Sequence, residues 1–322
     1  MNHNYETLAV LLIAFRRLES IKTILDCCHE AGVRRIYVTI DRATNEDDQY
    51  IQDSISNILE AYYDLFESLV IHKRDRNVGC AVSVLTGLDW IFSHETFVCV
   101  LEDDCIPSAD FFDFIRDSKP FLETEDDLML ACGTQFAPEH LTKTAWMKST
   151  FSLTWGWATT RSKWIKMRSY FFQDEDYPKS FSLRNSPYSF FKPSYSYWNF
   201  GAKRAYKGFV DVWDTILVRN LYNHNERALL PPSSLVNNIG SDLLATHTKK
   251  SEWTNRPTGI YKSTEASPQT NREIDMWLKK HFFKISFRHL FTTRFTALKD
   301  KYSKPPRSPL LNRWIENQII ES

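Results

Sequence analysis

The sequence has 322 residues, of which 43% are hydrophobic and 25% are charged, as in a globular protein with a sizeable core. Its 40 basic and 40 acidic side chains give a formal net charge of zero, which argues against a nucleic-acid-binding protein. No apolar run reaches the length of a transmembrane helix and no basic region precedes the first apolar stretch, so we expect a cytoplasmic protein.

The first part of the chain repeats a strand-then-helix pattern four times. Short, fully apolar runs predict buried strands, and apolar residues at helical spacing follow each of them. The longest helical pattern covers residues 47–65. This alternation predicts an α/β fold with a doubly wound, mainly parallel sheet. The predicted strands are residues 8–15, 35–40, 69–72 and 97–101.

Three acids follow the fourth predicted strand directly: Glu102, Asp103 and Asp104. Pro107 and Ser108 then give a helix-start signal. Adjacent carboxylates repel one another, and in α/β proteins ligands bind at this carboxyl edge of the sheet. A divalent cation with a phosphate ligand is the usual partner of such a cluster. The pattern therefore favours a ligand site over the alternative, a solvated acidic turn before a capped helix.

Other polar residues are predicted to reach the same edge of the sheet. Arg16 and Arg17 follow the first strand, Asp41 follows the second, and a loop containing Asn77 and Gly79 follows the third. Cations for phosphates and a carboxylate for base or ribose hydroxyls are what a nucleoside diphosphate needs. The sequence contains neither a phosphate-loop motif nor a GxGxxG motif, which argues against a nucleoside-triphosphate hydrolase or a dinucleotide dehydrogenase.

Beyond Gly133 the regular alternation fades. Residues 154–158 form an aromatic patch around one glycine, and residues 171–200 are rich in Ser, Tyr, Phe and Pro without a clear period. We interpret 171–200 as a long loop or lid. A helical pattern covers 211–218, and a later loop places His247 among hydroxyl side chains.

The segment 279–313 has ten Lys or Arg residues against one acid, with aromatic side chains between them. Such a segment fits either an anionic membrane surface or a helix that packs its aromatic face on the domain. Both alternatives stay open. The six cysteines show no zinc-ligand spacing, and we expect reduced core thiols.

The order of several motifs resembles that of GT-A fold glycosyltransferases, closest to the N-acetylglucosaminyltransferase I type and to similar bacterial sugar transferases. The resemblance covers roughly residues 7–250. It implies a nucleotide-sugar-binding half at 1–133, an acceptor-binding half of the same domain at 134–255, and a basic, aromatic extension at 256–322. The motifs are the acids 102–104 with Pro107, then Asp110-Phe-Phe112, Trp155-Gly-Trp157 and Trp213-Asp214.

The resemblance also implies roles for residues of the donor half. Asp104 would ligate Mn²⁺ or Mg²⁺, Asp103 would hold the ribose, and Glu102 would face the donor sugar. Arg16 or Arg17 and Asp41 match the nucleotide-binding positions of the family, and Asn77 and Gly79 lie beside them on the predicted edge.

In the acceptor half, Asp214 matches the catalytic base of the family and Trp213 the acceptor wall. Thr215 replaces the second acid of that motif, which leaves Asp211 as a rival base. Trp155 and Trp157 fit a sugar-stacking wall or core packing. His247 fits a ligand of the diphosphate or metal, or an ordinary hydrogen-bonded loop residue.

The implied activity is metal-dependent transfer of a sugar, with inversion, from a nucleotide-sugar donor to a saccharide or lipid-linked acceptor. The basic segment 279–313 and the missing signal sequence lead us to expect that the protein works at the cytoplasmic face of a membrane. Two alternatives remain: a sugar nucleotidyltransferase, whose Gly-rich basic loop is missing after Phe15, and a non-catalytic carbohydrate-binding protein with the same fold.

Overall fold

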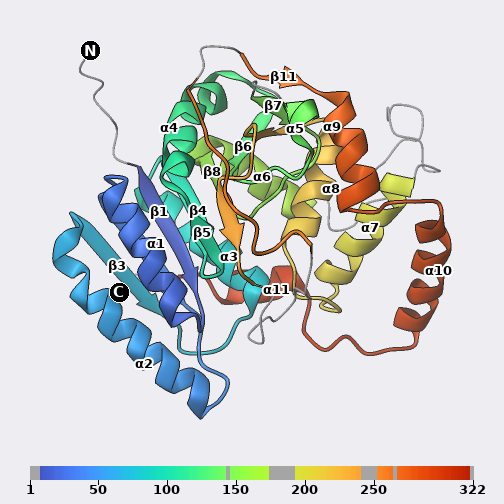
Figure 1. Ribbon diagram of the computed structural model, residues 1–322. Helices are drawn as coiled ribbons and strands as arrows, with labels where there is room; N and C mark the ends of the chain where they lie inside the picture. The colour runs from blue at the N-terminus through green and yellow to red at the C-terminus, as the bar shows by residue number, and fades with distance from the viewer. Residues whose placement is uncertain (1–7, 143–145, 174–192, 241–251, 264–266, 320–322) are drawn as a thin grey trace.

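The structure, a computed structural model, describes residues 8–142, 146–173, 193–240, 252–263 and 267–319. Within these residues, a nine-stranded mixed sheet crosses the molecule with helices on both faces (Figure 1). The strands, in order across the sheet, are β11 (Gln269–Thr270), β7 (Met147–Ser149), β9 (Arg227–Leu230), β6 (Leu128–Cys132), β8 (Trp157–Thr160), β4 (Phe97–Glu102), β1 (Ala9–Ala14), β2 (Arg35–Ile40) and β3 (Ser68–Lys73).

Strands β3, β2, β1 and β4 are neighbours and all run parallel. They are the four strands predicted from the apolar runs, and their spatial order is that of a doubly wound α/β sheet. The predicted α/β class with a mainly parallel sheet is confirmed. Parallel pairing puts the ends of β1, β2 and β4, and the polar residues after them, at one edge.

Alternate residues of β1 enter two different cores. Ala9, Leu11 and Ile13 pack with helices α3 (Cys80–His94) and α8 (Asp214–His224) on one face. Val10 and Leu12 pack on the other face with α1 (Leu18–Glu30), α2 (Glu46–Ala61) and α4 (Ala109–Thr124). A strand covered on both faces has no polar side, which explains why the sequence reads as one continuous apolar run. The helices are α1 (Leu18–Glu30), α2 (Glu46–Ala61), α3 (Cys80–His94), α4 (Ala109–Thr124), α5 (Glu139–Thr142), α6 (Arg161–Gln173), α7 (Pro193–Tyr206), α8 (Asp214–His224), α9 (Arg272–Trp277), α10 (Arg288–Lys301) and α11 (Leu310–Glu316), with a 3₁₀ turn η1 (Tyr63–Leu65) and a π-helical turn η2 (Leu278–Phe282).

The second half is more regular than its sequence indicates. Strand β8 runs antiparallel between β4 and β6, and β9 and β7 extend the same sheet. A separate pair, β5 (Cys105–Pro107) and β10 (Val236–Asn238), joins the acidic turn to the later loop. The interpretation of 171–200 as a loop is wrong at both ends, since α6 reaches Gln173 and α7 begins at Pro193, and 174–192 lie outside the described residues.

Both helices of the C-terminal segment lie against other helices of the protein. Helix α11 belongs to the core, where Leu310 and Trp314 are fully buried against the α3 face. Helix α10 stands at the edge of the molecule beside α7 (Figure 1). The six cysteines, all among the described residues, are free thiols. In the described part of the chain, no helix is both long and apolar enough to cross a bilayer.

Candidate functional site

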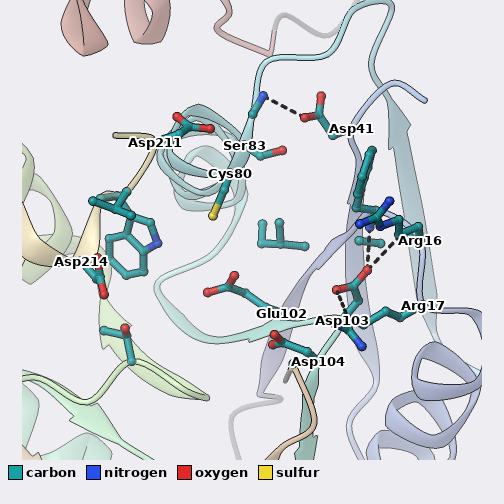
Figure 2. Close-up of a pocket in the computed structure, with 18 of the residues that line it drawn as sticks. Arg16, Arg17, Asp41, Cys80, Ser83, Glu102, Asp103, Asp104, Asp211 and Asp214 are labelled. Carbon is teal, nitrogen blue, oxygen red and sulfur yellow. Dashed lines mark hydrogen bonds and ion pairs between the residues drawn. The ribbon is translucent and has the colours of Figure 1, made fainter. Parts of the chain in front are cut away.

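A cavity of about 520 Å³ opens at the carboxyl ends of β1, β2 and β4, between the first turns of α3 and α8 (Figure 2). It gathers nearly every residue that the sequence analysis placed in the site. Those on its wall are Arg16, Arg17, Asp41, Asn77, Gly79, Glu102, Asp103, Asp104, Trp155, Asp211, Trp213 and Asp214. His247 lies outside the described residues.

Asp103 is fixed to the end of β1. Its Oδ2 accepts hydrogen bonds from the backbone N–H groups of Phe15 (2.8 Å) and Arg16 (3.1 Å), and Arg17 Nε lies 3.8 Å from its Oδ1. Burial, and next the charge of Asp104, raise the pKa of Asp103 to about 6, against the lowering by these donors. The donors therefore fix the position of the carboxylate, while burial keeps its pKa above the usual value.

Asp41, which follows β2, is held in a similar way by the loop that precedes α3. Its carboxylate accepts from the backbone N–H groups of Val78 and Gly79, both at 2.9 Å, and of Arg42 at 3.0 Å. Gly79 has a φ of +83°, which suits glycine and lets its N–H turn toward the acid. Burial raises the pKa of Asp41 despite these donors. The loop after β3 is thus shaped around one carboxylate.

Glu102 and Asp104 form the floor of the cavity and lack such backbone donors (Figure 2). Among the described residues, the Glu102 carboxylate makes no hydrogen bond or ion pair, and Asp104 accepts one from Cys105 Sγ at 3.3 Å. Burial, followed by the charges of Asp104, Asp214 and Asp103, raises the pKa of Glu102 well above its usual value. A cation bound between these side chains would relieve that repulsion.

Asp214 faces Glu102 from the opposite wall, at the first residue of α8 (Figure 2). Its Oδ1 accepts from the backbone N–H of Thr215 at 2.7 Å. Trp213 and the half-buried Trp155 line the same wall. Trp157 does not, because it lies in β8 with 1% of its surface exposed and packs on Trp213 at 5.4 Å between ring centroids. The prediction that Trp157 contacts an acceptor is corrected to core packing.

Asp211, the rival base, is tied to the C-terminal segment. Its Oδ1 accepts from Arg313 Nη2 at 3.1 Å, and Arg307 lies 3.6 Å from its Oδ2. Arg313 Nη1 also donates to Val78 O at 3.1 Å. Asp211 is thus 6% exposed and its carboxylate is engaged by two arginines, although it lines the cavity.

The sequence analysis missed several residues of the wall. Cys80 and Ser83 belong to the first turns of α3, and Arg307 reaches the cavity from the segment before α11. The helix spacing after Gly79 would have placed Cys80 and Ser83 at the edge. Nothing near Arg307 in the sequence indicates where its segment docks.

The donor set fits a hard cation only in part. Among the described residues, no group of three or more His, Cys, Asp or Glu side chains could hold a metal ion by itself. Mg²⁺ commonly takes one or two carboxylates and completes its shell with water and substrate phosphates. Glu102 and Asp104, both oxygen donors directed at the cavity, fit that mode.

No protein-family model and no curated protein match the sequence. Glucosyl-3-phosphoglycerate synthase from Mycobacterium tuberculosis, in complex with phosphoglyceric acid, is similar with 14% identity and a TM-score of 0.30, covering 48% of this chain and 57% of that one. A putative glucose-1-phosphate thymidylyltransferase from Bacillus anthracis, in complex with sucrose, is similar with 10% identity and a TM-score of 0.31, covering 55% of this chain and 77% of that one. A UDP-glucose pyrophosphorylase in complex with UDP-glucose is similar with 10% identity and a TM-score of 0.29, covering 51% of this chain and 78% of that one.

The chain thus aligns with little more than half of the synthase, 57% of its length. At such identities and TM-scores the likeness carries no argument about activity, which must come from the cavity itself.

Proposed function

We propose that the chain is an inverting glycosyltransferase that uses a nucleotide-sugar donor. The proposal rests on one observation: a single cavity holds two kinds of carboxylate. Asp41 and Asp103 are fixed by backbone donors, whereas Glu102 and Asp104 on the floor face Asp214 across open space. The first kind suits a hydroxyl-rich nucleoside, and the second suits a cation and a reacting sugar.

Asp103 and Asp41 would accept hydrogen bonds from ribose hydroxyls or the base, because their positions are already fixed and little entropy is lost on binding. Arg16 and Arg17 lie beside them and supply positive charge. Arg16 Nη1 is 3.4 Å from Asp48, and only 8% of the Arg17 side chain is exposed. Both guanidinium groups are therefore oriented before a phosphate arrives.

Glu102 and Asp104 would hold Mn²⁺ or Mg²⁺ together with the donor diphosphate. When bound, the ion would stabilise negative charge on the departing diphosphate. Asp104 is also close to the backbone of the later loop, since a side chain at Gly240 would begin 2.1 Å from its Oδ2.

Asp214 would remove the proton from the acceptor hydroxyl. The acceptor oxygen then forms a bond to the anomeric carbon, and the bond to the diphosphate breaks with its electron pair leaving on the nucleoside diphosphate. Attack from the side opposite the leaving group inverts the anomeric centre. Trp155, which is half-buried on the cavity wall, offers an apolar ring face for the face of a sugar, whereas Trp213 is 3% exposed and packs on Trp157 beside the cavity.

The donor site is tested by ligand-induced stabilisation against nucleoside diphosphates and nucleotide sugars, UDP-sugars of the hexose and N-acetylhexosamine types included, with and without Mn²⁺. Ligand at a hundredfold over its dissociation constant should add about 2.7 kcal/mol to the unfolding free energy. Asp104→Asn should abolish the metal-dependent part, whereas Asp113→Asn, a change of an exposed acid on α4, should not. If no nucleotide stabilises the folded wild type, the donor site does not exist.

Product analysis separates the alternatives. A transferase releases a nucleoside diphosphate from a nucleotide sugar, whereas a sugar nucleotidyltransferase consumes a nucleoside triphosphate and releases pyrophosphate. A non-catalytic carbohydrate-binding protein would bind sugar without metal and lose nothing in Asp214→Asn. The paired cavity walls favour the transferase, since a binding protein needs no acid across from Glu102.

Helix α10 carries the observation that favours contact with a membrane. The helix and its two flanking residues expose Phe287, Phe295, Leu298 and Tyr302, with exposed fractions of 69%, 75%, 61% and 83%. These positions fall on one side of a helix, and the surrounding segment is strongly basic. Aromatic side chains at a basic helix suit the interface of an anionic bilayer, which would bring a lipid-linked acceptor to the enzyme at the inner face of a membrane.

Sedimentation with vesicles tests this contact. Wild type should bind vesicles containing anionic lipid, and neutral vesicles much less. A Phe295→Ser/Leu298→Ser variant should lose binding while keeping its unfolding free energy, because both side chains already face solvent. Equal binding of the variant and the wild type would refute the contact.

A further inference from the structure

The wall of the donor cavity that is formed by α3 and the segment before α8 carries two buried polar atoms without a hydrogen-bond partner among the described residues. They are Asp211 Oδ2 and Ser83 Oγ, and the residues that bear them are 6% and 2% exposed. Both residues line the cavity. A buried polar atom without a partner is costly, and native structures seldom contain one without a reason. A bound ligand that completes these hydrogen bonds would be such a reason.

The carboxylate of Asp211 accepts a hydrogen bond on one oxygen only. Its Oδ1 accepts from Arg313 Nη2 at 3.1 Å, whereas Arg307 Nη2 lies 3.6 Å from Oδ2, too far for a hydrogen bond. The side chain of Arg307 is 39% exposed and lines the same cavity. A ligand in the cavity can therefore donate to Asp211 Oδ2 and accept from Arg307 at the same time.

The Asp211–Arg307 pair lies against the start of α3. A side chain at Gly79 would overlap both Asp211 Oδ2 and Arg307 Nη1, so the two groups lie directly over the backbone of that residue. The next residue, Cys80, lies between Asp211 and Glu102 (Figure 2). Burial, and then the charges of Glu102 and Asp211, raise the pKa of the Cys80 thiol, as expected if both acids border the same space. The pair and Glu102 therefore face one part of the cavity.

The chemistry of these atoms favours a ligand with hydroxyl groups. An ionised carboxylate oxygen only accepts hydrogen bonds and a guanidinium only donates them, so the ligand must do both. Adjacent hydroxyl groups of a sugar ring do both at once, whereas a phosphate only accepts and would be repelled by Asp211. The hydroxyl of Ser83 can donate to a further ligand hydroxyl or accept from it.

The ring that fits this position is the transferred sugar. Asp211 lies on the same side of the cavity as the proposed base Asp214, away from Asp103, which would hold the nucleoside (Figure 2). The anomeric carbon must lie between the diphosphate at Asp104 and the acceptor hydroxyl at Asp214. The ring that carries this carbon therefore extends along the wall that contains Asp211.

We propose that Asp211 and Arg307 bind adjacent hydroxyl groups of the transferred sugar and that Ser83 binds a further one, so that this wall determines which donor sugar is accepted. The inference rests on the proposed function, since it requires a nucleotide-sugar donor. It gives the C-terminal segment a part in donor selection, because that segment brings Arg307 to the cavity.

Calorimetric titration of the full chain with Mn²⁺ measures the dissociation constants of UDP, GDP and dTDP and of their hexose and N-acetylhexosamine derivatives. Ser83→Ala should weaken binding of the nucleotide sugar about 2- to 10-fold, because one hydrogen bond is lost, and leave the nucleoside diphosphate unchanged. Arg307→Met should weaken the nucleotide sugar by about 10- to 100-fold, because its hydrogen bond is charge-assisted. Ser93→Ala, at an exposed serine of α3, and Arg34→Met, at an exposed arginine, should change neither ligand.

Urea unfolding of the ligand-free protein is the second measurement. Because Ser83 Oγ has no partner there among the described residues, Ser83→Ala should keep the unfolding free energy, whereas a clear loss would make the hydroxyl structural and overturn its role in binding. If no nucleoside diphosphate binds to wild type, the donor site fails and this inference with it. If nucleoside diphosphates bind, but the two variants leave the nucleotide sugar unaffected or weaken both ligands equally, the sugar-binding wall is overturned while the donor site stands.

Discussion

Replacing Arg313 with methionine tests how the cavity wall is held together. Its guanidinium joins three chain segments: it donates to Asp211, to Val78 O and to Ser308 O, each at 3.1 Å. Methionine keeps the apolar stem of the side chain but removes every donor and the charge. The change therefore isolates the polar link between the C-terminal segment and the loop before α3.

The expected cost follows from the burial of Asp211. Only 6% of that residue is exposed, and removing one partner of a buried ion pair costs about 3–5 kcal/mol. Arg307 lies 3.6 Å from Asp211 Oδ2 with 39% of its side chain exposed, so it can move closer and compensate in part. We therefore expect a loss of about 3 kcal/mol.

Urea unfolding of wild type and Arg313→Met measures this loss, with Arg34→Met as an exposed control that should change the unfolding free energy by less than about 0.5 kcal/mol. The double variant Asp211→Asn/Arg313→Met removes both charges and should be more stable than Arg313→Met alone. A cost below about 1 kcal/mol for Arg313→Met, or no recovery in the double variant, would refute a buried charge pair at this position.

Three further outcomes are expected. In metal-free protein, the pKa of Asp103 is raised to about 6 from a usual 3.8, which favours the folded state at low pH. Wild type should therefore lose stability relative to Asp103→Asn as the pH rises from about 4 to 7, by at most about 1.4 kcal/mol per pH unit. Urea unfolding across that range checks the sign, and a relative gain in stability would contradict it. Asp214→Asn should lower turnover about 10²–10⁴-fold with an unchanged donor dissociation constant, since a base acts in the chemical step; weaker donor binding would assign it another role. Gly201→Ala should destabilise by about 1–3 kcal/mol through overpacking against Thr215, and Thr215→Ser should restore part of the loss in the double variant.

The first part of the sheet could be predicted because its signals are local. An apolar run such as 97–101 identifies a buried strand, and the residues that follow a parallel strand must lie at its carboxyl edge. That reasoning placed Arg16, Asp41 and Glu102 at one edge, whereas Asp214 was assigned to the site by a family resemblance alone. In a parallel sheet, the residues that follow neighbouring strands lie at the same edge.

The other half could not be predicted because its signals are not local. Helix α7 buries Tyr195 and Trp198 together with Asn199, so its polar and apolar residues do not alternate by face. Trp157 and Trp155 look equivalent in sequence, yet β8 turns one into the core and leaves the other on the cavity wall. Arg307 is placed by the docking of α11, which depends on contacts far away in the chain.

Trp314 gives that docking a consequence for synthesis of the protein. Its Nε1 donates to Asp89 Oδ2 on α3, across 225 positions of sequence. At about 5–20 residues per second, a ribosome needs roughly 10–45 s to make that stretch. Until α11 has been made, it cannot bury the face of α3 that Trp314 contacts. That face is then open to chaperones or to neighbouring nascent chains. Slowing translation late in the message should therefore lower the yield of folded protein more than slowing it early.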